Sequence, residues 1–134
     1  MLNRDDIIKK MSAFGYDKSR YWISTGAALV LHGVRESTRD IDVGCEPDVA
    51  QALIRSGCKA FPFPDGGVKI SFDEDIEVYE NWSRGDVVMI DSLPVLTLDS
   101  IIAIKRKLGR EKDFADIELI EKFLSGGEHP SAAK

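Results

Sequence analysis

The sequence contains only two cysteines and no long apolar run, and these absences exclude disulfide-stabilised scaffolds and membrane-spanning helices. Cys45 and Cys58 do not have the spacing of a metal site, so we expect two reduced thiols. No apolar run approaches the roughly 20 residues of a membrane span. The first residues, MLNRDDIIKK, carry acids where a secretory signal has its basic and apolar regions. We therefore expect a cytoplasmic protein without a membrane partner.

The chain also lacks an excess of positive charge. It has 18 lysines and arginines against 23 aspartates and glutamates, which gives a formal net charge of −5. This balance disfavours a protein built mainly to hold nucleic acid, but it does not exclude nucleotides, which bind through metal ions and local contacts. The length of 134 residues predicts one domain over 1–124. Glycine, proline and small polar residues predict a flexible C-terminal tail over 125–134.

Hydrophobic periodicity and capping residues predict an α+β fold. A first helix is expected between the N-cap Asn3 and the stop signal Gly15. The other predicted helices cover 25–33, 47–57, 98–108 and 112–124, and the predicted strands or extended segments cover 20–24, 39–45, 59–63, 68–72, 76–82, 86–90 and 94–97. This order predicts a small mixed β-sheet with helices packed on one side.

Two acids stand out in the strand predicted over 39–45. Asp40 and Asp42 alternate with the apolar Ile41 and Val43, so the two carboxylates are expected on one face of the strand. Two carboxylates at such a short separation repel each other, and a divalent cation bound between them removes this repulsion. Mg²⁺ binds through one or two carboxylates together with substrate phosphates and water. The alternative is a half-exposed strand whose acids face only solvent.

Two other acidic motifs fit this segment poorly. An EF-hand counted from Asp40 would need glycine at the sixth position and glutamate at the twelfth, where the chain has Cys45 and Gln51. A phosphatase with an aspartyl nucleophile has an apolar strand before its first acid, whereas RESTR precedes Asp40 here.

The segment upstream favours a phosphate ligand. Thr25, Gly26 and Ala27 lie where a predicted strand passes into a predicted helix. Free N–H groups at a helix start attract phosphate, and small residues allow it to approach. An ordinary tight turn is the alternative, but a helix start of this kind followed by D-x-D is a less common combination.

The segment STGAALVLHGVRESTRDIDV resembles the signature of minimal nucleotidyltransferases of the DNA polymerase beta-like superfamily. Thr25-Gly26 stands where that family has a G-G or G-S pair, Gly33 is the later glycine, and Arg39 follows Thr38 before the D-x-D. The closer resemblance is to AbiEii-like and antitoxin-associated small transferases. These carry a later gR-x-KD-x-x-D segment, for which this chain has KRKLGREKDFADIELI.

The resemblance implies a third carboxylate on a neighbouring strand, and Glu77 in DIEVYE fits it, with Asp75 in reserve. The family more often has aspartate there. Thr25 in place of glycine is a second departure, because its hydroxyl can contact phosphate while its Cβ crowds the approach. Asp40, Asp42 and Glu77 are then the implied catalytic and metal-binding residues, with Mg²⁺ or alternatively Mn²⁺ as the ion.

Basic residues complete the expected nucleotide site. Arg35 and Arg39 bracket ESTR, and Arg39 is preferred because it abuts Asp40. Lys105 is in line with the apolar stripe of its predicted helix, so it either snorkels outward or faces a polar cavity. Arg110, Lys112, Asp113 and Asp116 are expected to pair at helix spacings and fix a helix corner.

The prediction that follows is a Mg²⁺-dependent nucleotidyltransferase. It would move a nucleoside monophosphate from an NTP, such as ATP, to an acceptor hydroxyl on a small molecule, RNA or protein. Thr25, Gly26, Arg39 and Lys105 would bind the nucleotide. The alternative is a nucleotidyltransferase-like module that has lost turnover and acts in binding, as an antitoxin-type partner does. A homodimer is a further expectation.

Overall fold

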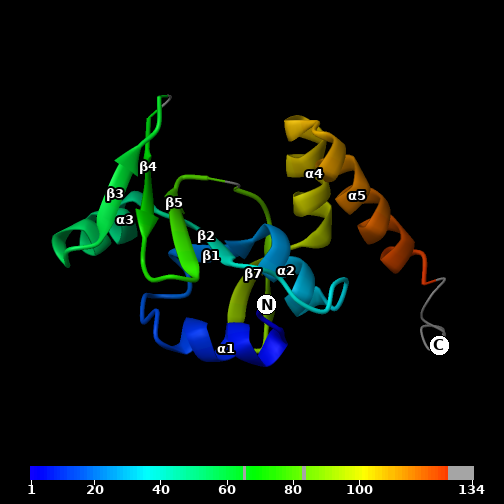
Figure 1. Cartoon of the computed structure of the whole chain (residues 1–134), viewed down its shortest axis with the longest axis horizontal. Coiled ribbons are helices and arrows are strands. Elements are labelled where there is room, and N and C mark those ends of the chain that lie inside the picture. The colour runs from blue at the N-terminus through cyan, green and yellow to red at the C-terminus, as the bar shows by residue number, and fades with distance from the viewer. Residues whose placement is uncertain (65, 83, 127–134) are drawn as a thin grey trace.

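A computed structural model describes residues 1–64, 66–82 and 84–126 (Figure 1). Its elements, in chain order, are α1 (Arg4–Ser12), β1 (Tyr21–Ser24), α2 (Thr25–His32), β2 (Ile41–Cys45), α3 (Pro47–Arg55), β3 (Lys59–Pro62), β4 (Val68–Ser71), β5 (Ile76–Glu80), β6 (Val87–Ile90), β7 (Leu93–Leu96), α4 (Leu98–Leu108) and α5 (Glu111–Leu124). Residues 65 and 83, and residues 127–134 of the predicted tail, lie outside the described residues.

The strands form one mixed sheet of seven strands in the order β3-β4-β5-β2-β1-β7-β6. Strand β2 pairs with β1 in the antiparallel sense and with β5 in the parallel sense, so it lies near the centre of the sheet. Strand β1 pairs with β7 in parallel, which brings the C-terminal part of the sheet beside the N-terminal part. The predicted α+β class with a mixed sheet is confirmed.

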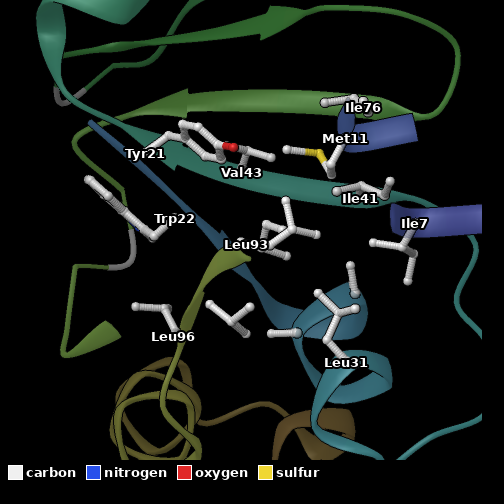
Figure 2. Packing of buried hydrophobic residues seen from close by; sticks show 14 of the residues in the cluster. Ile7, Met11, Tyr21, Trp22, Leu31, Ile41, Val43, Ile76, Leu93 and Leu96 are labelled. Atoms are coloured by element: carbon white, nitrogen blue, oxygen red, sulfur yellow. The ribbon is translucent and has the colours of Figure 1, made fainter. Parts of the chain in front are cut away.

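One face of the sheet carries the apolar core. Ile41 and Val43 on β2 and Ile76 on β5 are fully buried, and they alternate with side chains that point to the other face. Figure 2 shows Ile7 and Met11 of α1 beside Ile41 and Ile76. Helices α2 and α3 contribute further buried residues to the same core. The opposite face of the central strands is therefore left for polar side chains.

The N-cap predicted at Asn3 is confirmed, and two further helix ends have a clear capping residue. Asn3 and Asp6 form a reciprocal capping box at the start of α1. Thr97 accepts a hydrogen bond from the backbone of Ser100 at the start of α4. Gly33 ends α2 in the left-handed conformation, with φ of 88°. These residues fix where each helix begins or ends.

The prediction that a strand begins at residue 39 was wrong, because β2 begins at Ile41. Thr38 forms an antiparallel bridge with Leu2 instead, and the first strand hydrogen bond of this region runs from the Ile41 N–H to the Asp75 carbonyl. The N-terminus thus holds the chain just before the strand. Arg39 and Asp40 consequently lie in an exposed segment that leads into β2.

Helices α4 and α5 pack against each other at the side of the molecule away from β3 and β4 (Figure 1). Gly109 ends α4 with a positive φ of 65°, and Arg110 immediately caps α5. No helix within the described ranges combines the length and apolar character needed to cross a membrane.

Gly44 is predicted to be required on the polar face of β2. A Cβ there would overlap the indole of Trp22 and the carbonyl of Trp82, which are joined by a hydrogen bond of 2.9 Å. Gly44→Ala should lower the free energy of unfolding by about 1–3 kcal/mol, as overpacking does. It should also change tryptophan fluorescence, because it displaces the indole.

Gly57→Ala is the matched control, measured by urea unfolding followed by fluorescence. Gly57 has a φ of 101° and no neighbouring atom that a Cβ would meet. The free energy of unfolding of Gly57→Ala should fall by roughly 1–2 kcal/mol through backbone strain alone. This variant should keep native tryptophan emission. Unchanged emission and stability in Gly44→Ala would contradict the predicted overlap.

Candidate active site

The register of β2 and β5 places two carboxylates side by side. Asp42 pairs with Glu77 across the parallel strands, and Ser24 of β1 pairs with Asp42 on its other side. Paired residues point to the same face, and neighbouring strands lie about 4.8 Å apart. Asp42 and Glu77 therefore share the polar face of the sheet.

Asp42 lies in an environment that opposes its ionisation. Burial is the main cause that raises its pKa from 3.8 to about 6, and the charges of Asp40 and Glu77 raise it further. The Thr25 hydroxyl, which donates to Asp42 Oδ2 at 2.9 Å, and the charge of Lys69 act in the opposite direction. The balance leaves an acid that a cation or a proton would stabilise.

Glu77 is held by two neighbours on the same face. The Tyr79 hydroxyl donates to Glu77 Oε1 at 3.1 Å, and Lys69 Nζ lies 3.5 Å from the same oxygen. Burial, followed by the charges of Asp42 and Glu77, raises the pKa of Tyr79, so this hydroxyl stays a donor at neutral pH. Asp75, the reserve candidate, binds Lys10 of α1 at 3.0 Å instead.

The start of α2 carries two features suited to an anionic ligand. The Ser24 side chain is 1% exposed, and its Oγ has no hydrogen-bond partner among the described residues. Ser24 makes no side-chain cap, so the first N–H groups of α2 are not capped by it. Thr25 has a positive φ of 47°, a strained conformation for a β-branched residue.

Basic side chains from three segments line the same cavity as this helix start. Arg35 follows α2, Lys105 belongs to α4, and Arg110 and Lys112 lie at the start of α5. Lys105 is only 6% exposed, and its Nζ lies 3.0 Å from Asp116 Oδ2. Lys105 therefore faces a polar cavity that holds acids, one of the two alternatives its place on the helix allowed.

The predicted helix corner is confirmed for Arg110 and Asp113, whereas Asp116 pairs with Arg35 and Lys105 instead of at helix spacing. Arg110 donates to both oxygens of Asp113, at 2.6 and 3.0 Å, and its backbone N–H donates at 3.1 Å. These hydrogen bonds are the main cause that lowers the pKa of the buried Asp113 to about 2. The ion pair fixes the turn between α4 and α5, and so positions the basic side chains that these two helices carry.

A cavity of about 540 Å³ lies between the polar face of the sheet, the start of α2 and helices α4 and α5. Its lining combines the acid Asp42, the start of α2, the basic side chains described above, and the aromatic rings of Tyr79 and Trp82. Pockets for small ligands commonly have volumes of about 300–1,000 Å³. The volume suits a nucleotide.

The predicted site residues divide into two groups. Thr25, Asp42 and Lys105 line the cavity. The lining does not include Gly26, Arg39, Asp40 or Glu77. Asp40 and Glu77 nevertheless act on Asp42 through their charges.

Gly26 has a packing reason of its own. A Cβ at this position would overlap the Thr38 hydroxyl and lie 3.4 Å from Arg35 Nη1. Glycine here allows the segment after α2 to return across the start of the helix. This return brings Arg35 into the cavity.

The sequence favours Arg39 over Arg35, and it does not identify Ser24, Tyr79 or Trp82 as site residues. The alternation of side chains along a strand indicates that Ser24 and Tyr79 belong to the polar face. Ser24 pairs with Asp42, and Tyr79 alternates with the buried Val78 as Glu77 does. The signal for Arg35 is weaker, because it depends on how the chain turns after Gly33.

No group of three histidine, cysteine, aspartate or glutamate side chains in the described part of the chain could enclose a metal ion. The carboxylate donors nevertheless suit Mg²⁺, which commonly takes one or two protein carboxylates and completes its shell with phosphate and water. Asp42 is the central candidate ligand, with Asp40 and Glu77 as its carboxylate neighbours. Such an ion would need the nucleotide for part of its coordination.

Comparisons with known proteins support the fold. No family model matches the chain, and no curated protein sequence matches it. The crystal structure of ANT(2″)-Ia in complex with adenylyl-2″-tobramycin is similar, with a TM-score of 0.57 and 16% identity over 88% of this chain and 87% of that chain. The chain thus has a nucleotidyltransferase fold, whereas the AbiEii-like resemblance stays a prediction.

Asp42→Asn is predicted to stabilise the protein without metal at neutral pH. The folded state raises the pKa of Asp42 from 3.8 to about 6, so it binds this proton more tightly than the unfolded chain. Ionisation therefore lowers stability as pH rises through this interval, and the full penalty remains above it. The amide removes a penalty of up to about 2–3 kcal/mol.

Urea unfolding at pH 8 and pH 3.5 in EDTA measures this effect. The gain should be present at pH 8 and absent at pH 3.5. Glu118→Gln is the control, because Glu118 is exposed on α5 and is not among the residues around Asp42 that line the cavity. Equal effects of Asp42→Asn at both pH values would contradict the assigned environment.

Proposed function

We propose that the chain is a Mg²⁺-dependent nucleotidyltransferase that moves a nucleoside monophosphate from an NTP to an acceptor hydroxyl. The observation that carries this proposal is Asp42, an acid of raised pKa that lies between Thr25 at a helix start and Glu77 on the next strand. The nucleotidyltransferase fold supports the same class of chemistry.

The charge distribution of the cavity supports a polyphosphate substrate. Arg35, Lys105, Arg110 and Lys112 form its basic lining, and arginine and lysine both bind phosphate oxygens. The unpartnered Ser24 Oγ and the uncapped helix start offer hydrogen bonds to the same ligand. The triphosphate would lie between the start of α2 and helices α4 and α5.

The acids would bind the metal–nucleotide complex. Asp42, with Asp40 beside it, would hold the ion, and Mg²⁺ would neutralise charge on the phosphates during transfer. Glu77 would orient the attacking hydroxyl and accept its proton. Lys69 and Tyr79, which both contact Glu77, keep that carboxylate in place. The remaining contribution is positioning of the two reactants.

The aromatic rings offer a surface for the base. Tyr79 and Trp82 lie 4.5 Å apart between ring centroids, and both line the cavity. Aromatic faces bind all four bases, so they do not select one. The acceptor would enter from the open side of the cavity, and small molecules, RNA and protein all remain candidates.

The alternative is a binding module without turnover, of the antitoxin type. Glu77 motivates it, because its carboxylate does not line the cavity and is occupied by Lys69 and Tyr79. The two proposals share nucleotide binding and differ in whether pyrophosphate is released.

Asp40→Asn and Asp42→Asn are each predicted to reduce Mg²⁺-dependent NTP turnover by about 100-fold or more, because each removes charge that holds the metal–phosphate complex. The four NTPs are first screened with Mg²⁺ by thermal shift, since a ligand of the folded state raises its stability. Pyrophosphate release from the NTP that binds is then measured in each variant.

Glu118→Gln again serves as the control and should keep wild-type turnover. Full activity in Asp42→Asn would contradict the transferase proposal. Nucleotide binding without pyrophosphate release in the wild type, across nucleotides and candidate acceptors, would favour the binding module.

A further inference from the structure

The carboxylate of Asp116 bridges two cations inside the cavity. Arg35 Nη2 donates to Oδ1 at 2.7 Å, and Lys105 Nζ lies 3.0 Å from Oδ2. Each oxygen therefore has its own cationic partner. All three side chains line the cavity.

The bridge joins the segment after α2 to helices α4 and α5, at the place where polyphosphate is expected to bind. The Arg35 guanidinium lies beside the start of α2, since a Cβ on Gly26 would come within 3.4 Å of its Nη1. Lys105 reaches the same point from α4, with its side chain 8% exposed. The cations are thus held at the helix start by an anion from α5.

Asp116 differs from the other acid of its motif. Asp113 is fully buried and accepts three hydrogen bonds from Arg110, and its distance to Lys105 is the longer one, 3.5 Å. The Asp116 side chain is 22% exposed, and its ion pairs among the described residues are those with Arg35 and Lys105. Asp113 is therefore a structural acid, whereas Asp116 is partly exposed to the cavity and makes fewer hydrogen bonds.

A carboxylate with one oxygen on a guanidinium and the other on an ammonium has the arrangement that two phosphate oxygens would take. We propose, on the basis of the proposed function, that Asp116 holds the place of the terminal phosphates in the nucleotide-free protein. The incoming triphosphate displaces it from Arg35 and Lys105. After transfer, Asp116 returns to these cations and promotes the release of pyrophosphate.

The direct test is calorimetric binding of inorganic pyrophosphate to the full chain at low salt. Asp116→Asn should bind it roughly 3- to 10-fold more tightly, because a partly exposed competing ion pair is lost. Glu118→Gln removes an equal charge from the same helix and should change affinity by less than about 2-fold. Unchanged or weaker binding in Asp116→Asn would overturn the proposal.

Arg35→Gln separates competition from a general charge effect. Removal of Arg35 leaves Asp116 to compete for Lys105 alone, so the gain from Asp116→Asn should be smaller in this background. An equal gain in both backgrounds would overturn the proposal. It would mean that Asp116 acts only as a distant charge.

A second measurement uses the wild-type protein and does not depend on how the variants fold. The side-chain carboxyl ¹³C signal of Asp116 should move as pyrophosphate saturates the protein, because the carboxylate leaves both cations. A signal that stays in place at saturation would overturn the proposal.

Failure of this inference is distinguishable from failure of the proposed function. Pyrophosphate binding requires no nucleotidyl transfer, so a chain that never releases pyrophosphate from an NTP can still show the displacement. Conversely, turnover with an Asp116 signal that does not move would overturn only the displacement.

Discussion

The parallel pairing of β2 with β5 is the constraint on which the rest of the site depends. It sets Asp42 beside Glu77 on the face of the sheet that the core does not use. The alternate residues Ile41, Val43, Ile76 and Val78 are fully buried on the other face, so neither strand can slip by one residue without burying a carboxylate in the core. The apolar core thus maintains a pair of like charges that would otherwise separate.

Other elements of the fold offset the charges of Asp42 and Glu77. Thr25 donates to Asp42 from a strained backbone conformation, and Lys69 contacts Glu77. Across the cavity, the Arg110–Asp113 corner sets the position of α5, and Asp116 holds Arg35 and Lys105 at the start of α2. The result is a cavity lined by Asp42 from the sheet and by basic side chains from α4, α5 and the segment after α2, together with the aromatic rings of Tyr79 and Trp82. This separation of charge suits a metal–polyphosphate complex, whose ion and phosphates need opposite partners.

Much of the fold follows from local signals in the sequence. Asn3, Thr97 and Gly33 mark helix ends by capping chemistry that involves only nearby residues, and the alternation around Asp42 identifies a half-buried strand. The positions of the site residues depend more on contacts between distant parts of the chain. Asp40 lies before β2 because Thr38 pairs with Leu2, a contact between distant parts of the chain. Arg35 rather than Arg39 lines the cavity because the chain returns across Gly26, and strand and helix periodicity carry no information about that path.

Asp42 is an acid of raised pKa whose charge a bound cation would stabilise. An NMR titration of its side-chain carboxyl ¹³C signal tests this most directly, first without metal and then with Mg²⁺ and the NTP that binds. We expect titration near pH 6 in the free protein, and titration at a lower pH once the cation is bound, because a nearby positive charge favours the carboxylate. Titration near the ordinary aspartate value in both states, with no response to Mg²⁺ and nucleotide, would contradict it.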